Sequence, residues 1–330
     1  VDSGDVVFFI DHYFENRDLV KALPCRDTDF VIYANTTDEP STDWVDGHAD
    51  TVKLKFTKRP SAVVGIGGGA TLDLAKAVAN LLNNKGKASD YQGWGLVPNP
   101  GVYKIGVPTL SGTGAEASRT CVMMNYEKNL KLGMNSDHTV YDALVLDPDL
   151  TASVPRDQFF YTGLDTYIHC IESLNGEYRN NIADAHSREA LDISREIFLS
   201  NDMQSPDNRE KLMVASYLGG SAIGNSFVGV VHPLSAGLSV VLGFHHCIAN
   251  CIVMNVMEDF YPEETAEFHK MLALHDISLP ESVCAGLSDE QFERLYESSI
   301  IHEKPLINAL GDGFRDILTK SRVIELFGRM

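Results

Sequence analysis

A glycine triplet between an apolar segment and a helix-like segment is the feature that most constrains the fold of this chain. Residues 61–66 are small or apolar throughout, which is typical of a strand buried in a parallel sheet. Gly67, Gly68 and Gly69 follow directly, and residues 74–82 have helical periodicity. A strand, a glycine turn and a helix in this order direct backbone N–H groups at a pyrophosphate. The triplet also suits an ordinary turn and lacks the common G-x-G-x-x-G spacing, but its position favours dinucleotide binding.

Strand and helix patterns alternate around this motif in the first half of the chain. Apolar runs predict further strands, the first of them buried and parallel, at residues 6–10, 30–33, 104–108 and 143–146. Helical patterns predict a helix at about residues 14–22 and another that runs from a Ser or Thr cap to Val52. Beyond residue 155 strand-like runs nearly vanish and helical periodicity continues to the end. We therefore expect an α/β dinucleotide-binding domain over residues 1–152 and an all-helical domain over residues 153–330.

Asp165 and His169 are the first candidates for a chemical site in the second half. They are four residues apart in a segment whose apolar residues recur at helical spacing, so both side chains lie on one face of a helix. Such a pair also occurs on ordinary helix surfaces, and a single buried histidine is more often a hydrogen-bonded core residue than a ligand. Downstream, however, His232 and the adjacent His245 and His246 lie in apolar, glycine-rich surroundings. One carboxylate and three imidazoles are a donor set that suits Zn²⁺ or Fe²⁺.

Charge and cysteine content exclude several classes of function. The 330 residues carry 46 Asp and Glu against 27 Lys and Arg, a formal charge of −19, which argues against nucleic acid or an anionic membrane as a partner. We find no signal peptide and no apolar stretch of the length needed to span a bilayer. The six cysteines show no C-x-x-C spacing, and Cys247 and Cys251 are predicted to be buried thiols. We therefore expect a cytoplasmic protein in a reducing compartment.

These segments together resemble the iron-containing (group III) alcohol dehydrogenases over nearly the whole chain. The likeness is carried by GGGATLD at 67–73, PTLSGTGAE at 108–116, DPDL at 147–150 and GLDTYIH at 163–169, with His232 and His246. Within that family the chain is most similar to the 3-deoxy-D-manno-octulosonate (Kdo) 8-oxidases. The closer likeness is carried by YQGW at 91–94, SRT at 118–120, FYTG at 160–163 and GFHH at 243–246. The family likeness implies the same α/β and helical domain pair.

The resemblance also implies which residues hold a metal and a cofactor. The implied ligands of Fe²⁺ or Zn²⁺ are Asp165, His169, His232 and His246. The implied contacts of NAD are Asp11 at the adenosine ribose, Gly68, Gly69 and Asp73 around the pyrophosphate, Thr109 and Thr113 in a second loop, and Lys131 near the nicotinamide. An acidic side chain at the end of a strand accepts hydrogen bonds from a ribose 2′-hydroxyl and repels a 2′-phosphate. We therefore expect NAD to bind more tightly than NADP.

Two positions depart from the family pattern. Glu39, Pro40 and Ser41 stand where many members have Asn-Pro-Thr, which bears on the adenine side of the cofactor. Ala236 stands where many members have a histidine that relays the proton. We expect either His245 or the substrate's own hydroxyls and water to carry the proton instead, and we favour the second route.

The expected activity is oxidation of a primary alcohol to an aldehyde, with a metal to polarise the substrate oxygen and NAD to accept the hydride. The likeness to the Kdo 8-oxidases implies a sugar acid such as Kdo, oxidised at its terminal hydroxyl. The oxidase name leaves oxygen open as the electron acceptor. Candidates to bind so polar a substrate are Gln92, Arg119, Asn225 and Ser226. We expect the protein to form a homodimer.

Three different functions also remain compatible with the sequence. The first is a general iron-containing alcohol dehydrogenase that acts on small alcohols or diols. The second is a lyase like the dehydroquinate synthases, which also pair NAD with a metal but use a Glu among the ligands, where this chain has Asp-x-x-x-His. The third is a non-catalytic metal-binding protein, although structural metal sites are usually closed and rich in Cys.

Overall fold

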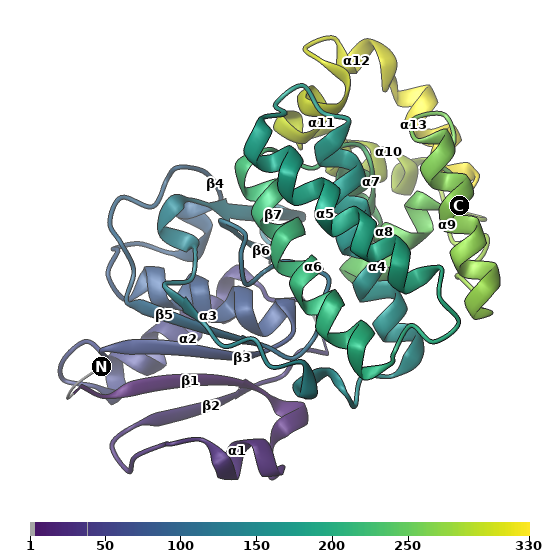
Figure 1. Ribbon diagram of the computed structural model, residues 1–330. Coiled ribbons are helices and arrows are strands. Elements are labelled where there is room, and N and C mark those ends of the chain that lie inside the picture. The colour runs from purple at the N-terminus through teal and green to yellow at the C-terminus, as the bar shows by residue number, and fades with distance from the viewer. Residues whose placement is uncertain (1–3, 38) are drawn as a thin grey trace. The chain divides into compact units, whose positions relative to one another are not determined.

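The computed structural model describes residues 4–37 and 39–330, and the chain forms two compact units (Figure 1). The first unit contains the chain up to Leu110 together with Ala115–Thr151. The second contains Ala152–Met330 together with the short segment Ser111–Gly114. Among the described residues, no helix is both long and apolar enough to cross a membrane.

A parallel sheet of five strands forms the centre of the first unit. Its order is β2-β1-β3-β5-β8, and every neighbouring pair is parallel. The strands are β1 (Val6–Asp11), β2 (Phe30–Ala34), β3 (Ala62–Gly67), β5 (Tyr103–Pro108) and β8 (Ala143–Leu144). All six residues of β3 are buried, as expected for a strand covered on both faces. The predicted α/β class is therefore confirmed.

Alternate residues of β1 enter two different cores, one on each face of the sheet. Phe9 packs with α2 (Thr42–Lys55) and α3 (Gly69–Leu81), whereas Phe8 packs on the other face with Leu19 of α1 (Asp18–Ala22). This alternation follows from the two-residue period of a strand. Two helix boundaries differ from the sequence prediction, because α1 is shorter than expected and α3 begins directly at the glycine triplet rather than five residues later.

The strand order changes direction between β1 and β3. From β1 the chain passes to β2 on one side, and from β2 it crosses to β3 on the other side of β1. In open parallel sheets, ligands bind beyond the carboxyl ends of the strands at such a point. Asp11 ends β1 and Gly67 ends β3. Two of the predicted cofactor segments therefore flank the position where this fold class binds its ligands.

A second sheet in the first unit is absent from the sequence prediction. It has the order β4-β7-β6, and β6 (Thr120–Asn125) and β7 (Leu130–Asn135) form an antiparallel hairpin beside the two residues of β4 (Gly93–Trp94). Asn129 at the turn adopts a φ of 51°, a left-handed conformation that Asn tolerates better than most residues. The predicted strand at 143–146 is also shorter than expected, because Val145 and Leu146 are exposed.

Helices alone form the second unit, as predicted. They are α4 (Arg156–Leu174), α5 (Asn181–Phe198), α6 (Pro206–Asn225), α7 (Val231–Leu242), α8 (His246–Met254), α9 (Pro262–His275), α10 (Asp289–Ile300), α11 (Glu303–Leu310), α12 (Phe314–Ile317) and α13 (Lys320–Gly328). Helix α4 packs against α5, α6 and α8 (Figure 1), and most of its residues from Phe159 to Ser173 are buried. The middle of the unit is therefore built around α4.

The segment Ser111–Gly114 belongs to the helical unit, although it lies between two strands of the first unit in the sequence. The N–H groups of Gly112 and Gly114 donate to Oγ of Ser216, at 2.8 and 3.3 Å. Oγ1 of Thr166 donates to the carbonyl of Gly112 at 2.8 Å. A Cβ atom on Gly112 would lie 1.7 Å from the carbonyl oxygen of Thr162, and φ there is +145°. Glycine is therefore required at this position.

Candidate metal centre

Asp165 and His169 lie on one face of the buried helix α4, as their spacing predicts. The side chain of Asp165 is fully buried and that of His169 is 3% exposed. The distance from His169 Nε2 to Asp165 Oδ1 is 3.6 Å. The alternative of an ordinary pair on a helix surface is therefore excluded, because both polar side chains are buried in the interior of the unit.

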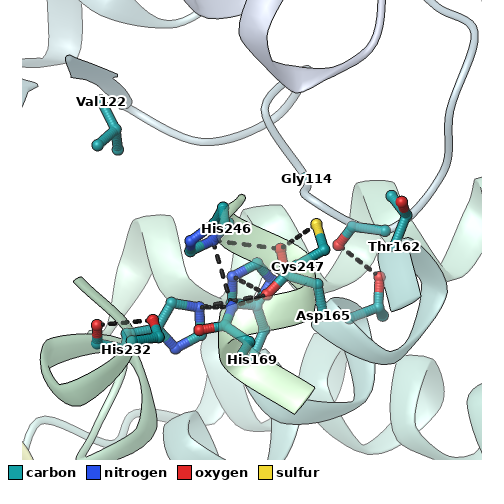
Figure 2. Close-up of polar contacts among 12 residues, drawn as sticks. Gly114, Val122, Thr162, Asp165, His169, His232, His246 and Cys247 are labelled. Atoms are coloured by element: carbon teal, nitrogen blue, oxygen red, sulfur yellow. Dashed lines mark hydrogen bonds and ion pairs between the residues drawn. The ribbon is translucent and has the colours of Figure 1, made fainter. Parts of the chain in front are cut away.

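Two further helices bring their histidines to Asp165. His232 lies in the first turn of α7, and its Nε2 is 3.3 Å from Asp165 Oδ1. His246 is the first residue of α8, and its Nε2 is 3.5 Å from Asp165 Oδ2. Figure 2 shows the three imidazoles grouped around the carboxylate of Asp165. The four predicted ligands thus come from three helices into one cluster.

The tightest part of the cluster is formed by Asp165, His232 and His246. Each of these residues offers a ligand atom, and the three atoms lie within 4.8 Å of one another. His169 lies slightly apart from this trio, and its ring stacks on that of His232 with centroids 4.7 Å apart and an angle of 15° between the planes. Side chains from separate elements that converge in this way are typical of a metal site.

The two stacked histidines respond differently to their surroundings. Burial lowers the pKa of His169 to about 3, because it outweighs the attraction of Asp165, so this imidazole is neutral at ordinary pH. Burial also opposes the charged form of His232, but the negative charges of Glu172 and Asp165 and the hydrogen bonds to both raise its pKa to about 9. Burial disfavours ionisation of Asp165, yet the surrounding imidazoles hold its pKa well below the usual range. The metal-free cluster therefore pairs an ionised Asp165 with a protonated His232.

Glu172 and Asn250 are part of the cluster, and the sequence prediction missed both. Glu172 Oε2 lies 2.5 Å from His232 Nδ1, and Asn250 Nδ2 donates to Asp165 Oδ1 at 2.7 Å. Asn250 Nδ2 also lies 3.3 Å from Nε2 of His232 and of His246. Both residues had a local signal. Glu172 follows His169 by three residues on the same helix face, and Asn250 follows His246 by four.

Four residues of α7 and α8, or next to them, were singled out in the sequence for proton transfer or as buried thiols. His245 is exposed at the N-cap of α8, and Ala236 is buried within α7. Cys251 is buried as predicted, but Cys247 is only partly buried and its thiol donates to Asp165 Oδ2 at 3.9 Å (Figure 2). The prediction that Cys247 is a buried thiol is therefore wrong, because this cysteine is the second residue of α8 and lies beside the cluster, not within the apolar core.

The predicted pyrophosphate segment of the first unit lies at the N-terminus of α3. Gly68 is the N-cap of α3 and makes no side-chain cap hydrogen bond, so the first N–H groups of that helix have no side-chain partner there. A Cβ atom on Gly68 would lie 2.7 Å from Leu110 Cδ1, so a larger residue there would require the side chain of Leu110 to move. Gly69 is the first residue of the helix. This arrangement is suited to a phosphate group.

Two of the predicted cofactor residues are held by neighbours within the first unit. Asp73 pairs with the buried Lys76 at 3.0 Å and accepts a hydrogen bond from the N–H of Val122 at 2.8 Å. Burial raises the pKa of Asp73, and the charge of Lys76 opposes this. Lys131 is 4% exposed and pairs with Glu39 at 2.9 Å. Glu39, one of the residues that differ from the family pattern, is thus the ion-pair partner of Lys131, the residue expected near the nicotinamide.

The remaining predicted cofactor residues lie at the ends of strands or in the following loop. Asp11 accepts hydrogen bonds from the N–H of Tyr13 at 2.9 Å and from Thr36 Oγ1 at 3.1 Å. Thr109 directly follows β5, and its N–H donates to the carbonyl of Gly67 at 2.9 Å. Thr113, in contrast, lies in the segment that belongs to the helical unit.

The four polar residues proposed for a sugar substrate are engaged elsewhere in the chain. The amide of Gln92 donates to the carbonyls of Met123 and Leu132, which joins β6 and β7, and Arg119 pairs with Asp137 at 3.1 Å. The side chains of Asn225 and Ser226 donate to backbone carbonyls within α6. These residues stabilise local structure, and their polarity alone does not indicate a sugar pocket.

Comparison with known proteins identifies the class. Residues 7–148 match the model of the iron-containing alcohol dehydrogenases, and residues 159–288 match the C-terminal model of the same family. Together the two matches extend over most of both units. The chain belongs to the iron-containing alcohol dehydrogenase family.

Individual relatives show how the chain compares with particular proteins. It is 31% identical over 237 residues to the sulfoacetaldehyde reductase of Bilophila wadsworthia, an alignment of 71% of this chain and 60% of that protein. It is 34% identical over 206 residues to the 4-hydroxybutyrate dehydrogenase of Cupriavidus necator, which covers 58% and 53% of the two chains. The match thus spans less than two thirds of the length of either relative. The fold matches the crystal structure of sulfoacetaldehyde reductase from Bifidobacterium kashiwanohense in complex with NAD+, with a TM-score of 0.78, 22% identity, and 98% and 90% of the chains covered.

Proposed function

We propose that this protein is a metal-dependent, NAD-linked oxidoreductase that interconverts a primary alcohol and an aldehyde. The observation that carries this proposal is the convergence of Asp165, His232 and His246, whose ligand atoms lie within 4.8 Å of one another inside the region matched by the family's C-terminal model. Membership of the iron-containing alcohol dehydrogenase family supports the reaction class. The NAD complex of a relative with the same fold supports the choice of cofactor.

The residues of the cluster fit a divalent cation. Asp165 is ionised, His169 is neutral, and a carboxylate holds Nδ1 of His232 so that Nε2 faces the cluster. We therefore assign Asp165, His169, His232 and His246 as the ligands of Fe²⁺ or Zn²⁺, since nitrogen and oxygen donors suit both ions. Such a cation supplies Lewis acidity, which polarises the substrate oxygen and lowers the pKa of an alcohol. Three neutral imidazoles and one carboxylate leave part of its charge for that purpose.

The first unit supplies the cofactor side of the proposal. The uncapped N-terminus of α3 and the glycine turn before it are suited to the pyrophosphate of NAD, and Asp11 lies at the end of the adjacent strand β1. Bound NAD would supply the hydride acceptor, while the protein provides orientation and electrostatics. Alanine at position 236 has no side-chain group that could relay a proton, and His245 is exposed. We therefore propose that the proton of the alcohol leaves through water or a hydroxyl of the substrate.

A primary alcohol that carries an acid group is the substrate class we propose. The two relatives named above take their names from a sulfonate-bearing aldehyde and a carboxylate-bearing alcohol. The sugar acid Kdo, to whose oxidases the sequence has a likeness, is the finer proposal within this class. Its support is the sequence likeness and the small side chain of Ala236. The four polar residues that we expected to bind a sugar do not add support, because they form contacts elsewhere in the chain.

Rates of NADH formation from matched substrates test both levels of the proposal. The protein is loaded with Fe²⁺ or Zn²⁺ and given NAD with 4-hydroxybutyrate against 1-butanol, and with Kdo against 1,2-propanediol. A higher kcat/KM for the acid of each pair supports the substrate class, and the highest value for Kdo supports the sugar acid. Faster turnover of the simple alcohols indicates a general small-alcohol dehydrogenase.

Controls distinguish the proposed dehydrogenase from an oxidase, a lyase and a binding protein. Removal of the metal with a chelator should abolish NADH formation, and its return should restore the activity. Oxygen consumption without NAD would indicate an oxidase. Metal and NAD that bind without any hydride transfer would contradict the proposal and favour the lyase or the binding protein. We also propose a homodimer, which sedimentation of the purified protein tests.

A further inference from the structure

Both carboxylate oxygens of Glu172 are engaged by the first turn of α7. Oε1 accepts the N–H of Val231 at 2.5 Å, and Oε2 lies 2.5 Å from Nδ1 of His232, which is 60 residues away in the sequence. The side chain of Glu172 is 0% exposed. A buried carboxylate with two partners on one turn is a built contact and not a chance approach of surface groups.

This contact determines which ring nitrogen of His232 faces Asp165. An ionised carboxylate only accepts hydrogen bonds, so Nδ1 of His232 must keep its hydrogen. The lone pair of the neutral ring is then on Nε2, the atom that lies 3.3 Å from Asp165 Oδ1. The ring orientation is also restricted, since its two nitrogens are held by carboxylates on opposite sides.

The residues at the start of α7 allow Glu172 to approach the backbone of this helix closely. Val230 is the N-cap and offers no side-chain oxygen, so Glu172 takes the place of a cap on the N–H of Val231. A Cβ atom on Gly229 would lie 2.6 Å from Tyr261 Oη and 3.2 Å from Glu172 Oε1. A larger residue at this position would therefore force the side chains of Tyr261 and Glu172 to shift. A negative charge at a helix N-terminus is also favourable to the helix dipole.

We infer that Glu172 is a positioning residue of the metal centre, which holds His232 through its Nδ1–H so that Nε2 is presented to the cation. This inference rests on the proposed function, because it requires that His232 is a metal ligand. Helix α4 then carries three members of one assembly, since Asp165, His169 and Glu172 follow one another at intervals of four and three residues on the same face. Carboxylates behind metal-bound histidines typically contribute about 10- to 100-fold in metal affinity.

Titration of the metal-free protein with Co²⁺, followed by calorimetry and by the visible absorption of the bound ion, tests the inference. Glu172→Gln should weaken Co²⁺ binding by about 10- to 100-fold. A matched control is Glu267→Gln, because Glu267 is another carboxylate of the helical unit, bonded to Tyr167 of α4 and to Arg195. That control should lower the melting temperature and leave the Co²⁺ affinity unchanged.

A double-mutant cycle separates positioning from a purely structural role. If Glu172 acts through His232, then Glu172→Gln in a His232→Ala background should cause no further loss of Co²⁺ affinity. Losses that multiply in the double variant would overturn the inference. If Glu172→Gln does not fold, Glu172→Asp takes its place in the same cycle, because the shorter carboxylate cannot reach both partners.

The outcomes distinguish this inference from the proposed function. Failure of the unchanged protein to bind Co²⁺ would overturn the metal centre itself. If the unchanged protein binds Co²⁺ and neither Glu172→Gln nor Glu172→Asp alters the affinity, only the role of Glu172 is overturned. Loss of affinity in the Glu172 variants that disappears in the His232→Ala background is the expected result.

Discussion

Nε2 of His232 lies 3.3 Å from Oδ1 of Asp165, and a second carboxylate, that of Glu172, lies on the other side of the same ring. Two negative charges on one imidazole favour its protonated form, and they do so despite burial. In the proposed metal centre, a proton and the metal ion would therefore compete for the same nitrogen.

The competition predicts a pH dependence of metal binding. The pKa of His232 in the metal-free protein is raised to about 9 by Glu172 and Asp165 against the effect of burial. A cation must displace this proton, so Co²⁺ affinity should rise about tenfold per pH unit between pH ~6.5 and ~9. Calorimetry in buffers of different ionisation enthalpy should show one proton released. An affinity that does not change over this window would contradict the competition.

Stability of the metal-free protein should follow the opposite course. The folded-state pKa of His232 is above the ordinary value of 6.5, so its contribution to stability is fully present below about pH 6.5 and is lost as the pH rises through about 9. Urea unfolding of the metal-free protein at a series of pH values measures this. His232→Ala should flatten the profile in that window, and an unchanged slope in this variant would assign the effect to another group.

Metal content distinguishes the two adjacent histidines before α8. His246 Nε2 lies 3.5 Å from Asp165 Oδ2, whereas His245 is exposed at the helix cap. His246→Ala should therefore lose most of the bound metal, and His245→Gln should keep it and lose less than about tenfold in turnover. Metal analysis with single-turnover kinetics checks both. Metal loss confined to the His245 variant would move the ligand by one residue.

Cofactor preference tests the charge of Asp11. Asp11→Asn keeps the shape of the side chain and much of its hydrogen bonding to Tyr13 and Thr36 but removes the negative charge. NADP should then bind about tenfold more tightly, a change of roughly 1.4 kcal/mol, while NAD changes little. Fluorescence titration with both reduced cofactors gives the ratio. Equal affinities for the two cofactors in the unchanged protein would remove the assignment.

Much of the fold was predictable because its signals are local. The apolar run of β3 and the glycines after it predict a buried parallel strand and a turn, and the spacing of Asp165 and His169 predicts a shared helix face. The hairpin of β6 and β7 was missed, since its strands carry Lys, Asn and Gly among the apolar residues.

The missing parts of the site depend on distant contacts. Glu172 gains its role from a histidine 60 residues further on, and Asn250 from an aspartate 85 residues earlier. The partner of Lys131 is Glu39, 92 residues before it in the sequence. The local spacing places Glu172 and Asn250 on the helix faces of His169 and His246, but it does not report which distant residue each of them contacts.

Gly112 provides a test of the segment Ser111–Gly114. Gly112→Ala would place a Cβ atom 1.7 Å from the carbonyl oxygen of Thr162 at a φ of +145°, so we expect a loss of more than about 3 kcal/mol in stability. Gly243→Ala is the matched control, because φ there is +74° and no atom lies within 4 Å of the added Cβ. That change should cost about 1 kcal/mol from backbone strain alone. Equal losses in urea unfolding would show that the close approach at Gly112 relaxes.

The placement of Ser111–Gly114 also bears on how the chain is synthesised and divided. The backbone passes from one unit to the other three times, after Leu110, Gly114 and Thr151. During synthesis this short segment leaves the ribosome before Thr166 and Ser216 have been added to the chain. Its hydrogen bonds to these residues can therefore form only after α4 and α6 have been synthesised. A gene divided after Thr151 would encode a helical fragment that lacks the hydrogen bonds of Thr166 and Ser216 to Gly112 and Gly114. Separate expression of the halves should therefore give a less stable helical unit than the intact chain contains.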